Sequence, residues 1–455
     1  MMKDNSDQQY ASFRNNIPGL FALAFVYVLL SRILMPKLVP QISPSDISNR
    51  ISFIIFASSV ALIALFGLSY FKMLFLVSIQ YGITRWAGSS ILNPILSWIF
   101  GIGILFLNEH YHGYEFATIH PALASMDSYK GIMHRWEIHF NFTMLRMVSY
   151  SMDYYWMLNE NHGDHQKIMD ESTPDGLRTD KERVKLSRYP SDYSFLHYLA
   201  YIFYLPLFLA GPIITFNDFM SQIHVQVRAL SWKRTALYGL RLLAALILME
   251  TMQHFIYVVA ISKSSAWDGL SPFQVSMVGY FNLNYIWLKL LIIWRFFRFW
   301  ALCDGIDTQE NMIRCMSNNY SAVGFWRSWH RSYNRWLIRY VYIPLGGTKY
   351  MAYNMWVVFT FVAVWHDISL TLLAWGWLIC LFILPEIIAK QAFSFMKVCF
   401  LVNLLIESML ESRVLSTCCS FWCSTEHFDD DDRQSGWLCR WYGWNEKDAC
   451  RHIYT

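Results

Sequence analysis

Apolar stretches recur along most of the chain. A helix needs about 20 apolar residues to span the hydrocarbon of a bilayer, and these stretches are of about that length or longer. The run 51–83 is long enough for one tilted helix or two short ones, and Lys72 inside it favours two. The pattern therefore predicts an all-α membrane protein, with spans at 17–35, 51–83, 90–106, 190–219, 236–261 and 275–293.

Two of these stretches carry features that lipid-facing helices rarely have. Pro206 and the pair Gly211 and Pro212 interrupt the stretch 190–219. Prolines free backbone carbonyls that protein or water must satisfy, so we expect this stretch to pack against other helices or a cavity. Glu250 lies within the stretch 236–261, and we expect its carboxylate to face the interior of the bundle.

Composition supports a membrane protein over a soluble one. Of the 455 residues, 55% are apolar, 18% are aromatic and only 15% are charged, too few charges for one or two soluble domains. The formal net charge of +4 is small and spread among loops, so we expect no nucleic-acid partner.

The polar segments divide the chain into three parts. We expect a polar N-terminus at 1–16, a membrane domain at 17–410 and a polar, Cys-rich tail at 411–455. No small-residue cleavage site follows the first apolar stretch, so this stretch is expected to remain as a signal anchor. The Cys residues and His427 of the tail match no common zinc-site spacing, and we interpret the tail as a divergent or mis-spliced terminus.

Two polar segments lie inside the membrane domain. Segment 108–136 holds four histidines, but no Cys or paired carboxylate completes a ligand set, so it predicts an interfacial loop and no metal site. Segment 135–154 is only partly apolar and predicts an interfacial or internally packed helix. Segment 159–190 is a long hydrophilic loop whose basic end, by the positive-inside rule, should be cytosolic. The basic residues are Arg178, Lys181, Arg183, Lys185 and Arg188.

Segment 325–342, FWRSWHRSYNRWLIRYVY, combines arginines with tryptophans and one histidine. On a continuous helix its arginines would form a cationic stripe, since they recur every four residues, and His330 and Asn334 would share a neighbouring face. The stripe suits either an interfacial helix anchored by tryptophans or a cradle for the phosphates of a nucleotide-bearing substrate such as coenzyme A. The four arginines are Arg327, Arg331, Arg335 and Arg339.

A second histidine, His366, follows the apolar segment 355–365. A polar group at membrane depth needs a partner or an aqueous cavity, so His366 is either part of a functional site or the mark of a helix end at the headgroup level. Histidine suits the role of general base at neutral pH. The chain has no GxSxG elbow and no recognisable nucleophilic Cys motif.

The stretch FWRSWHRSYNRWLIRYVYIPLGG, followed by VWHD, resembles the signature of the membrane-bound O-acyltransferase family. Three further stretches, RWEIHFNFTMLRMVSYSMDYYW, SDYSFLHYLAYIFYLPLFLAGPIITFNDF and RFWALCDGIDTQENMIRCMSNNYS, resemble its branch of glycerol uptake proteins, with hedgehog acyltransferase as a more distant relative. The resemblance covers roughly residues 111–388. Family members continue through several more spans after the second histidine, whereas here the apolar sequence stops near Leu410.

The resemblance implies a bundle of about ten transmembrane and re-entrant helices around a central tunnel, in the endoplasmic reticulum membrane. It implies transfer of a fatty acyl group from acyl-CoA, a co-substrate, to a hydroxyl of a lipid or glycolipid acceptor such as the lyso form of a glycosylphosphatidylinositol (GPI) anchor. Membrane lipids are the other expected partners, and no bound cofactor is expected. His366 would be the general base and His330 would orient or polarise the donor. The expected substrate-binding residues are Asn334, Arg327, Arg331 and Trp329.

Two other functions remain open at this point. Glycerol uptake by glycerol/proton symport would agree with the names in the branch, but such transporters often show two related halves, and no internal symmetry is visible. A non-catalytic, acyltransferase-like regulator is the third possibility, which the presence of both histidines argues against. If coenzyme A binds the arginine stripe, neutralising Arg327 or Arg331 should raise the KM for acyl-CoA more than neutralising Arg335 or Arg339.

Overall fold

A computed structural model of the chain describes residues 3–34, 45–133, 135–160, 175–225 and 230–395. The described part is helical, with one isolated β-bridge between Met312 and Trp329 and no strand. The chain forms two compact units, Met1–Leu384 and Pro385–Thr455. Of the second unit the structure describes only the end of one helix, and the expected domain boundary at residue 411 lies outside the described residues.

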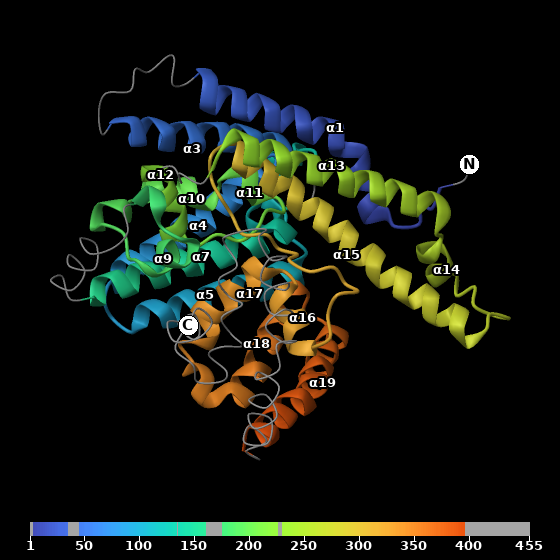
Figure 1. Ribbon diagram of the computed structural model, residues 1–455. Coiled ribbons are helices and arrows are strands. Elements are labelled where there is room, and N and C mark those ends of the chain that lie inside the picture. The colour runs from blue at the N-terminus through green and yellow to red at the C-terminus, as the bar shows by residue number, and fades with distance from the viewer. Residues whose placement is uncertain (1–2, 35–44, 134, 161–174, 226–229, 396–455) are drawn as a thin grey trace, which may run out of the picture. The chain divides into compact units, whose positions relative to one another are not determined.

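The first unit is built from long helices joined by short ones (Figure 1). Up to residue 160 these are α1 (Gln8–Leu29), α3 (Ser45–Phe66), α4 (Ser69–Ala87), α5 (Leu92–Tyr111), α6 (Phe116–Ile119) and α7 (Trp136–Asn159). After it come α9 (Asp180–Lys185), α10 (Phe195–Ile202), α11 (Leu205–Phe208), α12 (Phe216–His224), α13 (Trp232–Phe255), α14 (Val258–Ser264), α15 (Pro272–Cys303), α16 (Ala322–Ser328), α17 (Arg331–Leu337) and α18 (Met351–His366). The last helix, α19 (Leu370–Phe395), continues into the second unit.

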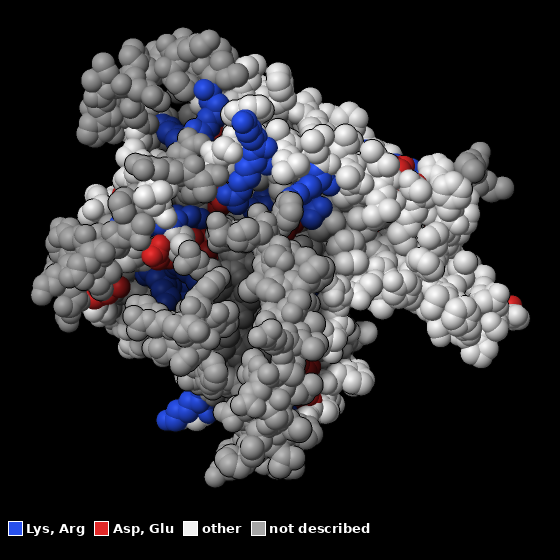
Figure 2. Space-filling view, viewed as in Figure 1, with Lys and Arg blue, Asp and Glu red and all other residues white. Residues whose placement is uncertain are grey.

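Five described helices are long and apolar enough to cross a membrane, which confirms a multi-pass, all-α membrane protein. Figure 2 shows a broad surface with few charges to the right of the view, while Lys and Arg gather to the left. The expected total of about ten membrane helices stays a prediction. The five candidate spans are Gln8–Arg32, Ile47–Phe66, Leu92–Tyr111, Trp232–Phe255 and Leu370–Lys390.

Helices α1, α13 and α15 pack together in the first unit, and α13 and α15 run side by side (Figure 1). Helix α1 begins inside the polar N-terminal segment because Asp7 caps it, accepting a hydrogen bond from the backbone N–H of Tyr10 at 2.9 Å. Glu250 of α13 forms an ion pair with Lys3 and accepts a hydrogen bond from the Tyr10 hydroxyl at 3.3 Å. Its carboxylate therefore has protein partners in the N-terminal segment.

The run 51–83 is two helices, as Lys72 indicated, and the break falls at Gly67. Gly67 has a φ of 61°, and an added Cβ would collide with the backbone oxygen of Tyr129. The segment after α5 lies against this elbow, and the N–H of Met133 donates to the carbonyl of Leu65 at 2.6 Å. The described residues of this segment form only short helices, as expected for a loop.

Helix α7 is packed internally, one of the two alternatives that its sequence allowed, and most of its side chains are buried. The stretch 190–219 is broken into α10, α11 and the start of α12 at its proline and glycine positions. Arg146 of α7 donates hydrogen bonds to the carbonyls of Tyr201 (3.3 Å) and Ile202 (2.6 Å) at the first break. The freed carbonyls are thus satisfied by protein, as predicted.

The basic end of the hydrophilic loop is only partly exposed. Arg178 is buried, Arg183 pairs with Asp218 at 2.6 Å, and Arg188 pairs with Asp192 at 3.3 Å. Lys181 and Lys185 of α9 are the cations of this cluster that remain exposed. The positive-inside rule counts lysines and arginines of the loop alike, so the cytosolic placement of this segment stays a prediction.

We expect a cysteine introduced at Lys185 to react with a membrane-impermeant thiol reagent in sealed vesicles whose cytosolic side faces outward. Lys185 is exposed, whereas its neighbour Ser187 is buried, so a cysteine at Ser187 serves as a matched control that should react only after denaturation. Labelling is compared with that of the chain without either change. Reaction at position 185 only after detergent treatment would place α9 on the opposite side of the membrane.

Candidate active site

His330 lies at a break between two helices. Helix α16 ends at Ser328 and α17 begins at Arg331, while His330 itself adopts the left-handed conformation with φ 45°. The prediction of one continuous helix across segment 325–342 was therefore wrong, and the four arginines do not form one stripe. A non-glycine residue held in this conformation costs about 1–3 kcal/mol and is typical of functional sites.

Asn311, from the segment between α15 and α16, holds the break in place. Its carbonyl accepts a hydrogen bond from the N–H of Arg331, and its side-chain Oδ1 accepts one from the N–H of Ser332, both at 3.1 Å. These are N–H groups of the first turn of α17, which the side chain of His330 leaves without a cap. Asn311 thus takes over the task of an N-cap and fixes the backbone beside His330.

The imidazole of His330 is buried among aromatic rings. Its ring centroid lies 4.3 Å from that of Trp294 of α15 and 5.3 Å from that of Tyr333 of α17. The side chain is 9% exposed, and its Nδ1 has no hydrogen-bond partner in the part of the chain that the structure describes. A buried polar atom of this kind is available to a substrate or a water molecule.

His366 is the last residue of α18, and the end of this helix is fixed to α7. Asn141 donates through Nδ2 to the carbonyl of Trp365 at 3.0 Å, and the indole N–H of Trp365 donates to the carbonyl of Asn141 at 2.9 Å. The ring of Trp365 lies 4.8 Å from that of His366, whose side chain is exposed. His366 is therefore accessible while its backbone is held.

The structure brings the two histidines into one site. Tyr333 contacts the ring of His330, and its centroid is 4.5 Å from that of Trp365, the neighbour of His366. The histidines are near enough for a positive charge on His366 to oppose one on His330. One of them can therefore act as a base while the other remains neutral.

A cavity of about 220 Å³ lies along α17 and is bordered by cations. Ser332 and Trp336 of α17 line it on one side. Its charged lining comes from α9, α12, α17 and the following π-helix η5 (Ile338–Tyr342), namely Lys181, Lys185, Asp218, Arg335 and Arg339. The surplus of positive charge suits an anionic group.

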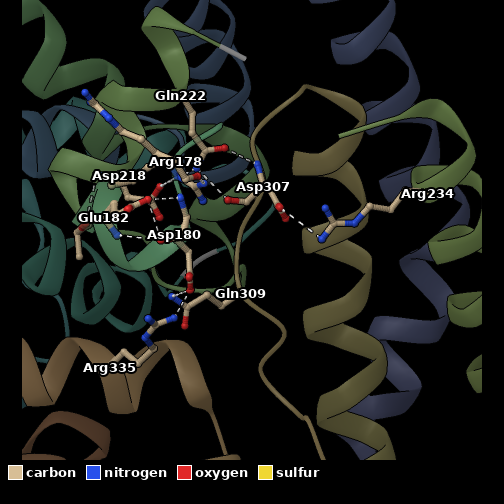
Figure 3. Close-up of polar contacts among 12 residues, drawn as sticks. Arg178, Asp180, Glu182, Asp218, Gln222, Arg234, Asp307, Gln309 and Arg335 are labelled. Atoms are coloured by element: carbon tan, nitrogen blue, oxygen red, sulfur yellow. Dashed lines mark hydrogen bonds and ion pairs between the residues drawn. The ribbon is translucent and has the colours of Figure 1, made fainter. Parts of the chain in front are cut away.

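The two arginines of the cavity are held by carboxylates. Arg335 forms an ion pair with Asp180, which also accepts a hydrogen bond from Gln309 at 3.2 Å (Figure 3). Burial raises the pKa of the Asp180 carboxyl, but the charges of Arg335, Arg183 and Arg331 outweigh it and hold this pKa below its usual value. Asp180 therefore stays ionised at neutral pH and competes with a ligand for Arg335.

Arg339 reaches the cavity from a more deeply buried position. Its guanidinium donates to Oδ1 of Asp153 at 2.9 Å, and the hydroxyl of Tyr340 donates to the same oxygen at 3.0 Å. Asp153 is fully buried in α7 and also accepts a hydrogen bond from the backbone N–H of Asn217 at 3.3 Å. This carboxylate joins α7, α12 and η5.

The expected substrate-binding residues lie near His330, outside the lining of the cavity. Asn334 donates to the carbonyl of Trp326 at 3.2 Å, and Trp329 packs against Phe325 with ring centroids 5.4 Å apart. Arg327 is exposed, and the charge of Arg331 reaches Asp180. The sequence analysis assigned Lys181 and Lys185 to topology alone, because they lie far from the arginine segment in the chain and only the fold brings them beside Arg335.

Comparison with known proteins identifies one family of membrane enzymes. The sequence profile of the membrane-bound O-acyltransferase family matches residues 121–406. The chain is 45% identical to membrane-bound O-acyltransferase gup1 of Schizosaccharomyces pombe over 84% of this chain and 66% of that protein. It is 45% identical to membrane-bound O-acyltransferase GUP1 of Saccharomyces cerevisiae over 86% of this chain and 69% of that protein. Mouse protein-cysteine N-palmitoyltransferase HHAT is 29% identical over 41% of this chain and 39% of its own length.

Proposed function

Since the chain belongs to the membrane-bound O-acyltransferase family, we propose that it transfers a fatty acyl group from acyl-CoA to a hydroxyl of a lipid acceptor. The observation that carries the proposal is the meeting of His330 and His366 in one site, with one ring buried and the other accessible. The lyso form of a GPI anchor is the proposed acceptor, and the endoplasmic reticulum membrane is the proposed location. Both follow from the resemblance to the glycerol uptake branch.

His366 acts as the general base in this proposal. Its imidazole takes the proton of the acceptor hydroxyl as the hydroxyl oxygen attacks the carbonyl carbon of the thioester. The carbon–sulfur bond then breaks, and the departing coenzyme A sulfur takes the proton back from His366. His330, buried and neutral, orients the donor and polarises its carbonyl. The accessibility of His366 and the burial of His330 support this division of roles.

The cationic cavity along α17 is the proposed site for phosphate groups of coenzyme A. Lys181, Lys185 and Arg335 supply charge-assisted hydrogen bonds there, and arginine forks match phosphate oxygens. Asp180 is the resting partner of Arg335. An incoming phosphate takes its place, so that Arg335 exchanges one anionic partner for another. Arg327 and Arg331, on the side nearer His330, are the alternative phosphate ligands.

The proposed function is tested with purified protein, isotopically labelled acyl-CoA and a panel of lysolipids that includes a lyso-GPI. The expected product is an O-acylated lipid with one molecule of free coenzyme A released for each acyl group transferred. The same preparation in sealed proteoliposomes is assayed for uptake of labelled glycerol under a proton gradient. Glycerol uptake without any acylated product would refute acyl transfer and support transport.

Replacement of Arg335 by Gln is expected to raise the KM for acyl-CoA by about tenfold to a hundredfold, since a bond to a charged phosphate contributes about 1.5–3 kcal/mol. The KM for the acceptor should change by less than about twofold. Arg331→Gln is the matched control, because Arg331 is on the same helix but outside the cavity lining. If only Arg331→Gln raises the KM for acyl-CoA, the phosphates bind beside Arg327 and Arg331 and not in the cavity.

A further inference from the structure

Tyr333 contacts both His330 and Trp365, the residue that precedes His366. Its side chain is 4% exposed. The ring lies 4.5 Å from the ring of Trp365 and 5.3 Å from that of His330, as measured between centroids. Because α17 begins just before it and Trp365 is clamped to α7, the ring of Tyr333 is held on both sides. A group attached to this ring therefore has a defined position beside His330 and Trp365, the neighbour of His366.

The hydroxyl of Tyr333 has no hydrogen-bond partner among the described residues. Other buried tyrosines nearby do have one: the Tyr340 hydroxyl bonds to Asp153 at 3.0 Å, and the Tyr201 hydroxyl donates to the carbonyl of Ile214 at 2.8 Å. Leaving such a group unsatisfied costs about 1–3 kcal/mol. A phenylalanine would fill the same space without this cost, so packing alone does not explain a tyrosine at this position.

We propose that Tyr333 is a further catalytic residue, whose hydroxyl donates a hydrogen bond to the thioester carbonyl oxygen of the donor. The proposal rests on the acyl transfer proposed above and adds a residue to it. It is independent of where the coenzyme A phosphates bind. The ring of His330 contacts Tyr333, and its Nδ1 also has no hydrogen-bond partner among the described residues. Two buried polar groups at this position therefore have no partner within the described protein.

Acyl transfer proceeds in two stages. The oxygen of the acceptor hydroxyl forms a bond to the carbonyl carbon, the electron pair of the C=O bond moves to the carbonyl oxygen, and the hydroxyl proton passes to His366. The C=O bond then forms again, the bond from carbon to sulfur breaks, and coenzyme A leaves with the proton held by His366. Tyr333 keeps its own proton throughout and stabilises the negative oxygen between the two steps.

Tyr333→Phe tests the proposal because it removes only the hydroxyl. The expected result is a fall in kcat of about 10²–10³-fold, the usual cost of losing one donor to an oxyanion. The KM values for donor and acceptor should stay within about twofold, since the bond strengthens in the transition state. The melting temperature should not fall, because the hydroxyl bonds to nothing in the described protein.

Tyr340→Phe is the matched control. It removes an equally buried hydroxyl that does bond to Asp153 and lies 2.8 Å from the Ser149 hydroxyl, so it should lower the melting temperature. The role of Tyr333 is overturned if kcat is unchanged in Tyr333→Phe, whether or not the KM for the donor rises. It is also overturned if Tyr333→Phe lowers the melting temperature as Tyr340→Phe does. If His366→Ala is inactive while Tyr333→Phe is fully active, only this inference fails. If His366→Ala is active, the proposed base fails first.

Discussion

Replacement of His366 by alanine is expected to lower the rate of acyl transfer by about 10²–10⁴-fold, the usual contribution of a general base. The loss should appear in kcat, since the base acts on the proton that moves in the transition state. Membrane insertion and stability should be retained, because the side chain is exposed and the end of α18 is held through Trp365. The measurement is the rate of labelled acyl transfer at saturating donor and acceptor.

His110→Ala is the control for this experiment. His110 is an exposed histidine near the end of α5, with its ring 4.6 Å from that of Tyr111, and it has no place in the proposed mechanism. Its rate should equal that of the unchanged protein. Full acyl transfer by a well-inserted His366→Ala protein would remove His366 from the mechanism, whatever the behaviour of the other variants.

The second large effect concerns stability. Replacement of Asp153 by alanine should lower the free energy of unfolding by about 3–5 kcal/mol, because it leaves the guanidinium of Arg339 buried without its counter-charge. The Tyr340 hydroxyl and the backbone N–H of Asn217 also lose an acceptor. The measurement is the temperature at which the detergent-solubilised protein loses its monodisperse peak in size-exclusion chromatography after heating.

A double variant separates loss of the ion pair from loss of packing. Asp153→Ala combined with Arg339→Met removes the unpaired charge, so this protein should unfold at a higher temperature than Asp153→Ala alone. Arg339 lines the cationic cavity, and the double variant should for that reason bind acyl-CoA more weakly even where stability is recovered. Equal melting temperatures for Asp153→Ala and the unchanged protein would mean that the ion pair does not stabilise the fold.

Several of the membrane helices were predictable from local sequence. The predicted spans 17–35, 90–106 and 236–261, and the first half of 51–83, coincide with helices long and apolar enough to cross a membrane. The stretch 190–219 forms short buried helices instead, and 275–293 lies in α15, which is not among the five candidate spans of the described residues. Lys72 predicted two helices in 51–83, although the break falls at Gly67. The packed interior around α7 was left open between two alternatives. Internal packing of α7 depends on partners such as Tyr201 and Arg339, which are distant from it in sequence.

The arginine segment shows where local reasoning fails. Its spacing predicted one helix, but Asn311 bonds to the N–H groups of Arg331 and Ser332 and interrupts the helix at His330. The cavity was missed for the same reason, since Asp180 and Arg335 are 155 residues apart in the chain. The two histidines were predicted as a pair from the family resemblance, whereas the contacts of Tyr333 that connect them appear only in the fold.

The buried charges of α7 affect how the protein is made. During synthesis α7 leaves the ribosome with Arg146 and Asp153, two side chains that are buried in the folded protein and that are costly to bury without partners. The carbonyls that satisfy Arg146 belong to α10, and Arg339, the partner of Asp153, is translated 186 residues later. We therefore expect α7 to reach its final packing only after these later segments have been made, so that the order of assembly differs from the order of translation.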